Sequence, residues 1–153
     1  MGDDDFGTYV QDGIVNILRD SLVPLATIIT PNQYELGLLT DTKNRTVDGL
    51  KEAGLKLREY ARRHLVTTGC VFDDTKAGCI ETTLYQETEL HRTAKPKLPL
   101  RPCGTGDLFT SFLVSHLCVG QPLQQAYEYA TEEIYQVLLK TLERKSEEMC
   151  IVN

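Results

Sequence analysis

Two glycines and an aspartate stand close together in Gly104-Thr105-Gly106-Asp107, directly before a stretch with the apolar spacing of a helix. Glycine lets the backbone approach a ligand closely, and the N–H groups at a helix N-terminus attract anions. An aspartate in the first turn can accept a proton from a hydroxyl held beside that anion. The segment therefore combines an anion-binding turn with a general base, as phosphoryl transfer requires. An ordinary loop-to-helix junction is the alternative, and the Lys-Ser/Thr ending of a P-loop is absent.

Asn32 and Glu35 form a second polar pair, at the start of another expected helix. Residues three apart lie on one face of a helix. Their oxygen atoms suit Mg²⁺, which keeps several waters and takes few protein carboxylates. The same pattern is a capping box that satisfies the first N–H groups of a helix. Taken alone, the pair is explained more simply by capping.

Val66-Thr67-Thr68-Gly69 is a third motif, at the end of an expected strand. Hydroxyl and backbone groups there can contact the phosphates or ribose of a nucleotide. Threonine is common in strands, so this motif is the weakest of the three.

Strands and helices alternate along the chain, which predicts an α/β layer sandwich with a largely parallel sheet. Ligands of such sheets bind outside the carboxyl ends of the strands, where the three motifs fall. The expected elements are a helix over 9–22 stopping before Pro24, a strand over 27–30, a helix from 32, a helix over 46–63, a strand over 65–68, two antiparallel edge strands within 79–98, an extended loop over 95–102, a helix over 105–119 and a last helix from 122.

Composition excludes several other classes of protein. The net charge of -6 argues against a non-specific nucleic-acid binder. The longest apolar run, over 22–29, is far shorter than the ~20 residues that span a bilayer, and the acidic start of the chain differs from a secretory signal. The five cysteines lack a CxxC pair, so free thiols are expected. We therefore expect a cytoplasmic protein without a nucleic-acid or membrane partner.

The wording around these motifs resembles one family. Residues 20–35 read DSLVPLATIITPNQYE, and DELVPLADIITPNQFE is typical of the pyridoxal kinases, a branch of the ribokinase-like superfamily. In that superfamily an N-x-x-E motif is followed much later by G-x-G-D, as here. Gly104 to Phe109 and the helix after Pro122 also resemble this branch, and the resemblance extends from Met1 to about Glu148.

The resemblance implies a ribokinase-like three-layer sandwich and ATP-dependent phosphorylation of pyridoxal, pyridoxine or pyridoxamine. ATP and Mg²⁺ are the implied cofactors, a monovalent cation is left open, and a homodimer is the implied assembly. By family pattern, the roles are Asp107 as base toward the substrate's hydroxymethyl group; Gly104, Thr105 and Gly106 as the anion hole; Asn32 and Glu35 at the metal; and Asp3, Tyr9, Thr30, Thr67 and Thr68 at ATP.

Members of that family are much longer, so we expect residues 1–153 to form one partial ribokinase-like domain, the ATP-binding half, without the N-terminal side of the sheet. Little kinase activity and poor solubility are then expected of the isolated chain. Two alternatives stay open. One is a non-catalytic fragment that binds nucleotide or associates with other subunits. The other is a hydroxymethylpyrimidine kinase, although those enzymes commonly have Cys where Asp107 stands.

Overall fold

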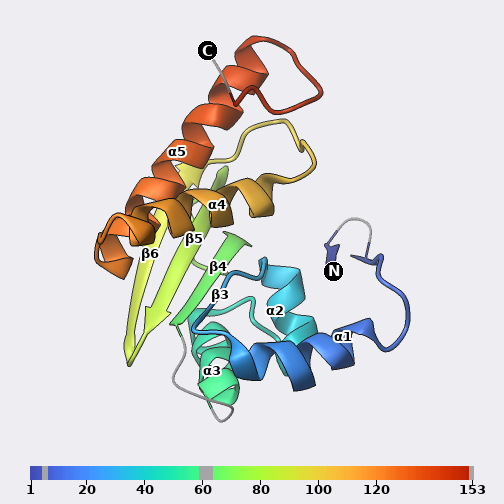
Figure 1. Ribbon diagram of the computed structural model, residues 1–153. Coiled ribbons are helices and arrows are strands. Elements are labelled where there is room, and N and C mark those ends of the chain that lie inside the picture. Colours follow the sequence, from blue (N-terminus) through green and yellow to red (C-terminus); the bar gives the residue numbers. More distant parts are fainter. Residues whose placement is uncertain (5–6, 59–63, 152–153) are drawn as a thin grey trace. The chain divides into compact units, whose positions relative to one another are not determined.

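A computed structural model describes residues 1–4, 7–58 and 64–151 (Figure 1). The chain divides into two compact units, residues 1–94 and residues 95–153, and each is described by itself. A single domain over the whole chain stays a prediction.

The first unit contains a four-stranded sheet with short helices (Figure 1). Its elements in chain order are β1 (Gly2–Asp3), β2 (Gly7–Thr8), α1 (Ile14–Ile17), η1 (Leu18–Leu22), η2 (Val23–Leu25), β3 (Ile28–Ile29), α2 (Gln33–Thr40), α3 (Val47–Arg58), β4 (His64–Cys70), β5 (Cys79–Gln86) and β6 (Glu89–Pro96), whose last residues belong to the second unit.

The sheet is mixed rather than largely parallel. Its order is β3-β4-β5-β6, with β3 parallel to β4 and β4 antiparallel to β5. A parallel return needs about a dozen residues or more, and the connection over 71–78 is too short for one. Residues 87 and 88 alone join β5 to β6, so this pair forms the edge hairpin that the sequence predicted. The expected parallel pairing holds for β3 and β4 only.

The first helical segment differs from its prediction at both ends. It begins at Ile14, after Gly13 in a left-handed conformation, and passes through a π-helical turn. It then continues into the short 3₁₀ turn η2, which contains Pro24. Proline is tolerated in the first turn of a helical segment, where its missing N–H has no partner to lose. The predicted end of the next long helix, at residues 59–63, lies outside the described residues.

The core of the first unit lies between helices α2 and α3 and the sheet. Its buried residues include Leu36, Leu50, Leu57 and Tyr85. Gly54 lets α3 approach the sheet closely, because a Cβ there would lie 2.3 Å from Cδ1 of Tyr85. The absence of a side chain at this position is therefore a packing requirement.

The second unit is built on two helices, α4 (Thr105–Cys118) and α5 (Leu123–Glu143), which pack against each other (Figure 1). Phe109 and Leu113 of α4 are buried, as are Ala126, Tyr127 and Ala130 of α5. The helices predicted over 105–119 and from 122 are confirmed. None of the helices in the described ranges combines the length and apolar character that crossing a membrane needs.

Candidate active site

The start of α2 is a complete capping box. The Asn32 side-chain oxygen accepts the N–H of Glu35 at 2.8 Å, and Oε2 of Glu35 accepts the N–H of Asn32 at 3.0 Å. The remaining side-chain groups bind the N-terminal strand segment. Nδ2 of Asn32 donates to the carbonyl of Gly2 at 2.9 Å, and the Met1 ammonium meets Oε1 of Glu35 at 2.8 Å. The capping interpretation is therefore correct, and both side chains are held in place.

A magnesium role is compatible with this arrangement in one form only. No cluster of three histidine, cysteine, aspartate or glutamate side chains in the described ranges is arranged to hold a metal ion. One carboxylate and one amide oxygen cannot enclose a cation. They do fit a hydrated Mg²⁺, whose remaining ligands are waters and phosphates.

The strand ends bring the other predicted groups of the first unit to the same place. Thr30 follows β3, and the N–H of Thr68 on β4 donates to the carbonyl of Pro31 at 3.1 Å. Asn32 and Thr68 form an isolated parallel bridge. The sequence prediction that the polar motifs after β3 and β4 lie together is therefore confirmed.

Thr67 and Tyr9 differ sharply in exposure. Thr67 is fully buried on β4, and in the part of the chain that the structure describes its hydroxyl has no hydrogen-bond partner. Tyr9 is 65% exposed, and its N–H donates to the carbonyl of Met1 at 3.1 Å. Asp3 lies on β1, next to the Gly2 carbonyl that Asn32 contacts. Thr68 is thus better placed than Thr67 to meet a ligand.

The glycine turn of the second unit opens helix α4. Gly104 is the N-cap residue, with a left-handed φ of 82° that favours glycine. The carbonyl of Gly104 accepts the N–H of Leu108 at 3.0 Å, and the hydroxyl of Thr105 donates to the carbonyl of Pro102 at 2.8 Å. Asp107 is exposed in the first turn of the helix. The first N–H groups of a helix have no intrahelical partner, so the turn combines such groups with an exposed carboxylate.

The tail after α5 lies beside this turn. The methyl carbon of Met149 would lie 3.4 Å from a Cβ at Gly104. The N–H of Cys150 donates to the hydroxyl of Thr141 at 3.0 Å, and this hydroxyl also donates to the carbonyl of Val137. A side-chain hydroxyl of α5 therefore holds the tail against the second unit.

The predicted residues thus form two groups. Asp3, Thr30, Asn32, Glu35 and Thr68 gather in the first unit, and Gly104 to Asp107 form the turn of the second. The prediction that Glu35 and Asp107 meet at one triphosphate–magnesium complex stays a prediction.

Sequence reasoning missed the contribution of Gln33. Its buried side chain binds Asn44, Arg45 and Val71, residues distant along the chain. The only signal in the sequence was an amide at the first position of an otherwise apolar helix face.

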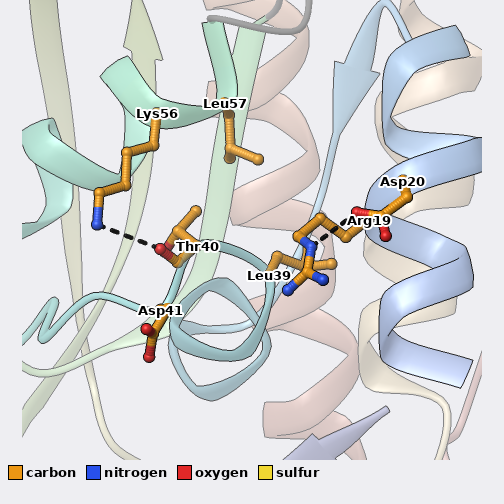
Figure 2. Close-up of a pocket in the computed structure, with 7 residues that line it drawn as sticks. All are labelled: Arg19, Asp20, Leu39, Thr40, Asp41, Lys56 and Leu57. Carbon is orange, nitrogen blue, oxygen red and sulfur yellow. Dashed lines mark hydrogen bonds and ion pairs between the residues drawn. The ribbon is translucent and has the colours of Figure 1, made fainter. Parts of the chain in front are cut away.

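A cavity of about 420 Å³ lies at the opposite end of α2 from the capping box (Figure 2). Arg19 pairs there with Asp20 at 2.9 Å, and Lys56 donates to the carbonyl of Thr40 at 3.4 Å. Its cationic side chains therefore have partners within the chain. None of the predicted site residues lines this cavity.

The strand order, the helix-opening turns and the polar strand ends define an α/β protein of the ribokinase-like fold, the class that includes the pyridoxal kinases. The chain belongs to the phosphomethylpyrimidine kinase family, whose sequence pattern it matches over residues 5–151.

Similar proteins carry the names of pyridoxal kinases or of phosphomethylpyrimidine kinases. The chain is 36% identical over 141 residues to the pyridoxine/pyridoxal/pyridoxamine kinase of Bordetella avium, covering 92% of this chain and 48% of that protein. A putative phosphomethylpyrimidine kinase of Bacteroides thetaiotaomicron, solved with pyridoxal, is 29% identical, with a TM-score of 0.78 over 92% of this chain and 51% of that one.

The pyridoxal kinase of Bacillus subtilis, solved as an ADP complex, is 26% identical, with a TM-score of 0.70 over 84% of this chain and 50% of that one. The chain spans about half the length of the curated relatives it matches.

Proposed function

We propose that this chain carries the ATP site and catalytic base of a pyridoxal kinase, which transfers the γ-phosphoryl group of ATP to the 5′-hydroxymethyl group of pyridoxal. The observation that carries the proposal is the left-handed Gly104 at the start of α4, with Asp107 exposed in the first turn. The names of the Bordetella avium and Bacillus subtilis relatives support this choice of reaction.

Residues 104–107 supply the chemical step in this proposal. The N–H groups of Gly104, Thr105 and Gly106 bind the oxygens of the transferring phosphoryl group, where negative charge is greatest. Asp107 takes the proton of the hydroxymethyl group as its oxygen bonds to the γ-phosphorus. The bond from that phosphorus to the bridging oxygen breaks, and ADP leaves with the electron pair. The products are pyridoxal 5′-phosphate and ADP.

The capping box and the polar strand ends orient the nucleotide in this proposal. Asn32 and Glu35 would hold the water shell of Mg²⁺, while Thr30, Thr68, Asp3 and, at the rim, the exposed Tyr9 would contact ATP. The fully buried Thr67 supports Thr68 from within the sheet. When bound, Mg²⁺ would neutralise charge on the phosphates of ATP. The name of the Bordetella avium relative supports pyridoxine and pyridoxamine as further substrates. The resemblance to pyridoxal kinases implies a cytoplasmic location and a homodimer, and we include both in the proposal.

The family name supports a second kinase reaction, the phosphorylation of a pyrimidine substrate. The family whose pattern the chain matches is named for phosphomethylpyrimidine phosphorylation. A pyrimidine with a hydroxymethyl group presents the same nucleophile to Asp107. The non-catalytic alternative keeps nucleotide binding but no transfer, since the chain spans about half of its relatives' length.

Calorimetric titration of the chain with ATP and Mg²⁺ tests the proposal. We expect binding by the wild type, loss of about tenfold in affinity for Asn32→Ala with Glu35→Ala, and little change for Asp107→Asn. Absence of binding by the folded wild type would contradict the proposal. Phosphorylation assays with pyridoxal, pyridoxine, pyridoxamine and hydroxymethylpyrimidine then separate the two reactions. If Asp107→Asn transferred phosphate as fast as the wild type, Asp107 would not be the catalytic base.

A further inference from the structure

Gln33 is the first residue of α2, and its side chain is only 2% exposed. All the hydrogen-bonding positions of its buried amide are occupied. Nε2 donates to the carbonyl of Asn44 at 2.8 Å and to that of Val71 at 3.4 Å. Oε1 accepts the N–H of Val71 at 3.0 Å and Nη1 of Arg45 at 2.9 Å. The side chain of Asn44 donates back to the Gln33 carbonyl at 2.8 Å. A buried amide with this many partners has one orientation only.

These contacts continue the sheet past the point where β3 ends. The carbonyl of Pro31 accepts the N–H of Thr68, and Asn32 forms an isolated parallel bridge with Thr68 just before α2 begins. The Gln33 side chain then meets both the N–H and the carbonyl of Val71, as a neighbouring strand would. The segment from Thr68 to Val71 is therefore held at both ends. Gly69, with a left-handed φ of 68°, lies between the two contacts.

One side chain thus fixes two parts of the candidate site relative to each other. Gln33 follows Asn32 directly and precedes Glu35 by two residues, so its orientation sets the start of the helix that carries both. The same amide sets the path of the strand exit that carries Thr68. On its other side this exit is paired with β5 through Cys70 and Glu81, so the Gln33 amide fixes the side that continues β3.

Arg45 extends this connection to the N-terminal strands. Its Nη1 binds Gln33 and its Nη2 pairs with the carboxylate of Asp4, the residue after Asp3 of β1. Half of the Arg45 side chain is exposed. The guanidinium group therefore links the buried amide to the segment beside the capping box.

We propose that Gln33 is a positioning residue for nucleotide binding, which holds the Asn32–Glu35 pair and the Thr68–Gly69 exit at the separation that a magnesium–nucleotide complex requires. This inference rests on the function proposed above. Gln33 acts through its neighbours and contacts no ligand. Its removal should therefore reduce the effect of Mg²⁺ on nucleotide affinity.

The test is calorimetric titration of the whole chain with ATP, once with Mg²⁺ and once with EDTA. The ratio of the two dissociation constants is the magnesium gain, which a purely structural role would leave unchanged in any variant that stays folded. We expect Gln33→Ala to lower the magnesium gain about tenfold, because several hydrogen bonds fix the geometry. Gln124→Ala is the matched control, since Gln124 is exposed and its side chain donates to Glu128 on its own helix.

Arg45→Met serves as a second variant, because the Arg45 side chain is half exposed and its replacement should disturb folding less than a change at the buried Gln33. It removes one of the contacts to the Gln33 amide, so a decrease of about threefold in the magnesium gain is expected. An unchanged gain in folded Gln33→Ala overturns the inference and leaves the proposed function intact. If Gln33→Ala does not fold, an unchanged gain in Arg45→Met overturns it. A wild type without any magnesium gain overturns both proposals.

Discussion

The carboxylate of Glu81 on β5 accepts two hydrogen bonds from the guanidinium group of Arg92 on β6, at 2.7 and 2.8 Å. Glu81 is almost completely buried. The other edge of the same guanidinium binds Asp74 in the turn after β4, and its face lies 4.9 Å from the ring centroid of Phe72. This group therefore ties the edge hairpin to the turn that leaves β4.

Glu81→Gln should make the protein less stable at neutral pH and less sensitive to acid. Hydrogen bonds from Arg92 lower the pKa of Glu81 below its ordinary value of 4.5. The stability that this ionised group contributes is therefore complete above that value and is lost as pH falls through the lower folded pKa. We expect the free energy of unfolding to fall by about 3 kcal/mol at neutral pH and to decrease less steeply than in the wild type as the pH is lowered. Urea unfolding at neutral and acidic pH measures both, with the exposed Glu89→Gln as control. Equal acid sensitivity of wild type and Glu81→Gln would contradict the prediction.

Gly106→Ala should separate folding from binding. A Cβ at Gly106 meets nothing within 4 Å, and alanine in a helix is favoured over glycine by up to about 1 kcal/mol. The melting temperature should therefore stay or rise, while ATP affinity falls because the methyl group blocks the anion. Gly54→Ala gives the opposite stability result, since its Cβ would collide with Tyr85 and cost about 1–3 kcal/mol. Undiminished ATP affinity in Gly106→Ala would argue against the anion hole.

Thr67→Val should not destabilise the protein. The buried hydroxyl of Thr67 has no hydrogen-bond partner in the described chain, and an isosteric methyl removes that unsatisfied group, for a gain of about 1 kcal/mol. Chemical unfolding measures the change. Because the hydroxyl is buried, ATP affinity should not change either. A clear loss of affinity would instead give Thr67 a direct part in binding.

Cys70 and Cys103 should react very differently with alkylating reagents. Burial raises the pKa of the Cys70 thiol to about 12, whereas Cys103 is exposed. The thiolate is the reactive form, so at about pH 8 Cys103 should be modified and Cys70 should not. Mass spectrometry of the iodoacetamide-treated native protein, with the unfolded protein as reference, identifies each site. Rapid labelling of native Cys70 would contradict its burial.

Leu25→Glu should reduce self-association of the chain. Leu25 is 81% exposed, and Ile17 and Leu22 nearby are each more than half exposed. Together with β3 at the sheet edge they leave apolar surface uncovered. Sedimentation velocity should show association of the wild type and less of the variant, with Thr88→Glu in the β5–β6 turn as a control for added charge. A monodisperse wild-type monomer would refute this expectation.

The sequence predicted local features better than distant ones. The helix expected over 105–119 is α4, and the Asn32–Glu35 capping box formed as its spacing indicated. Periodicity and capping depend on neighbouring residues, so they can be recognised without the fold. The antiparallel pairing of β4 with β5 also has a local signal, because the connection over 71–78 is too short for a parallel return.

The partners of Gln33 could not be foreseen. Asn44 and Val71 are 11 and 38 residues away, and only the packed structure brings their backbone groups to the amide. A buried side-chain hydrogen bond depends on three-dimensional placement, which one-dimensional patterns do not contain. The same applies to Arg92, whose partners Glu81 and Asp74 meet it through the turn and the hairpin.

The capping box of α2 also affects how a ligand would be received. Asn32 and Glu35 are already fixed by each other, by Gly2 and by the Met1 ammonium. These two side chains therefore have little conformational freedom to lose when a ligand binds, in contrast to a segment that folds only on binding. Recognition there resembles docking onto a rigid template, and its heat-capacity change should reflect dehydration rather than ordering of the chain.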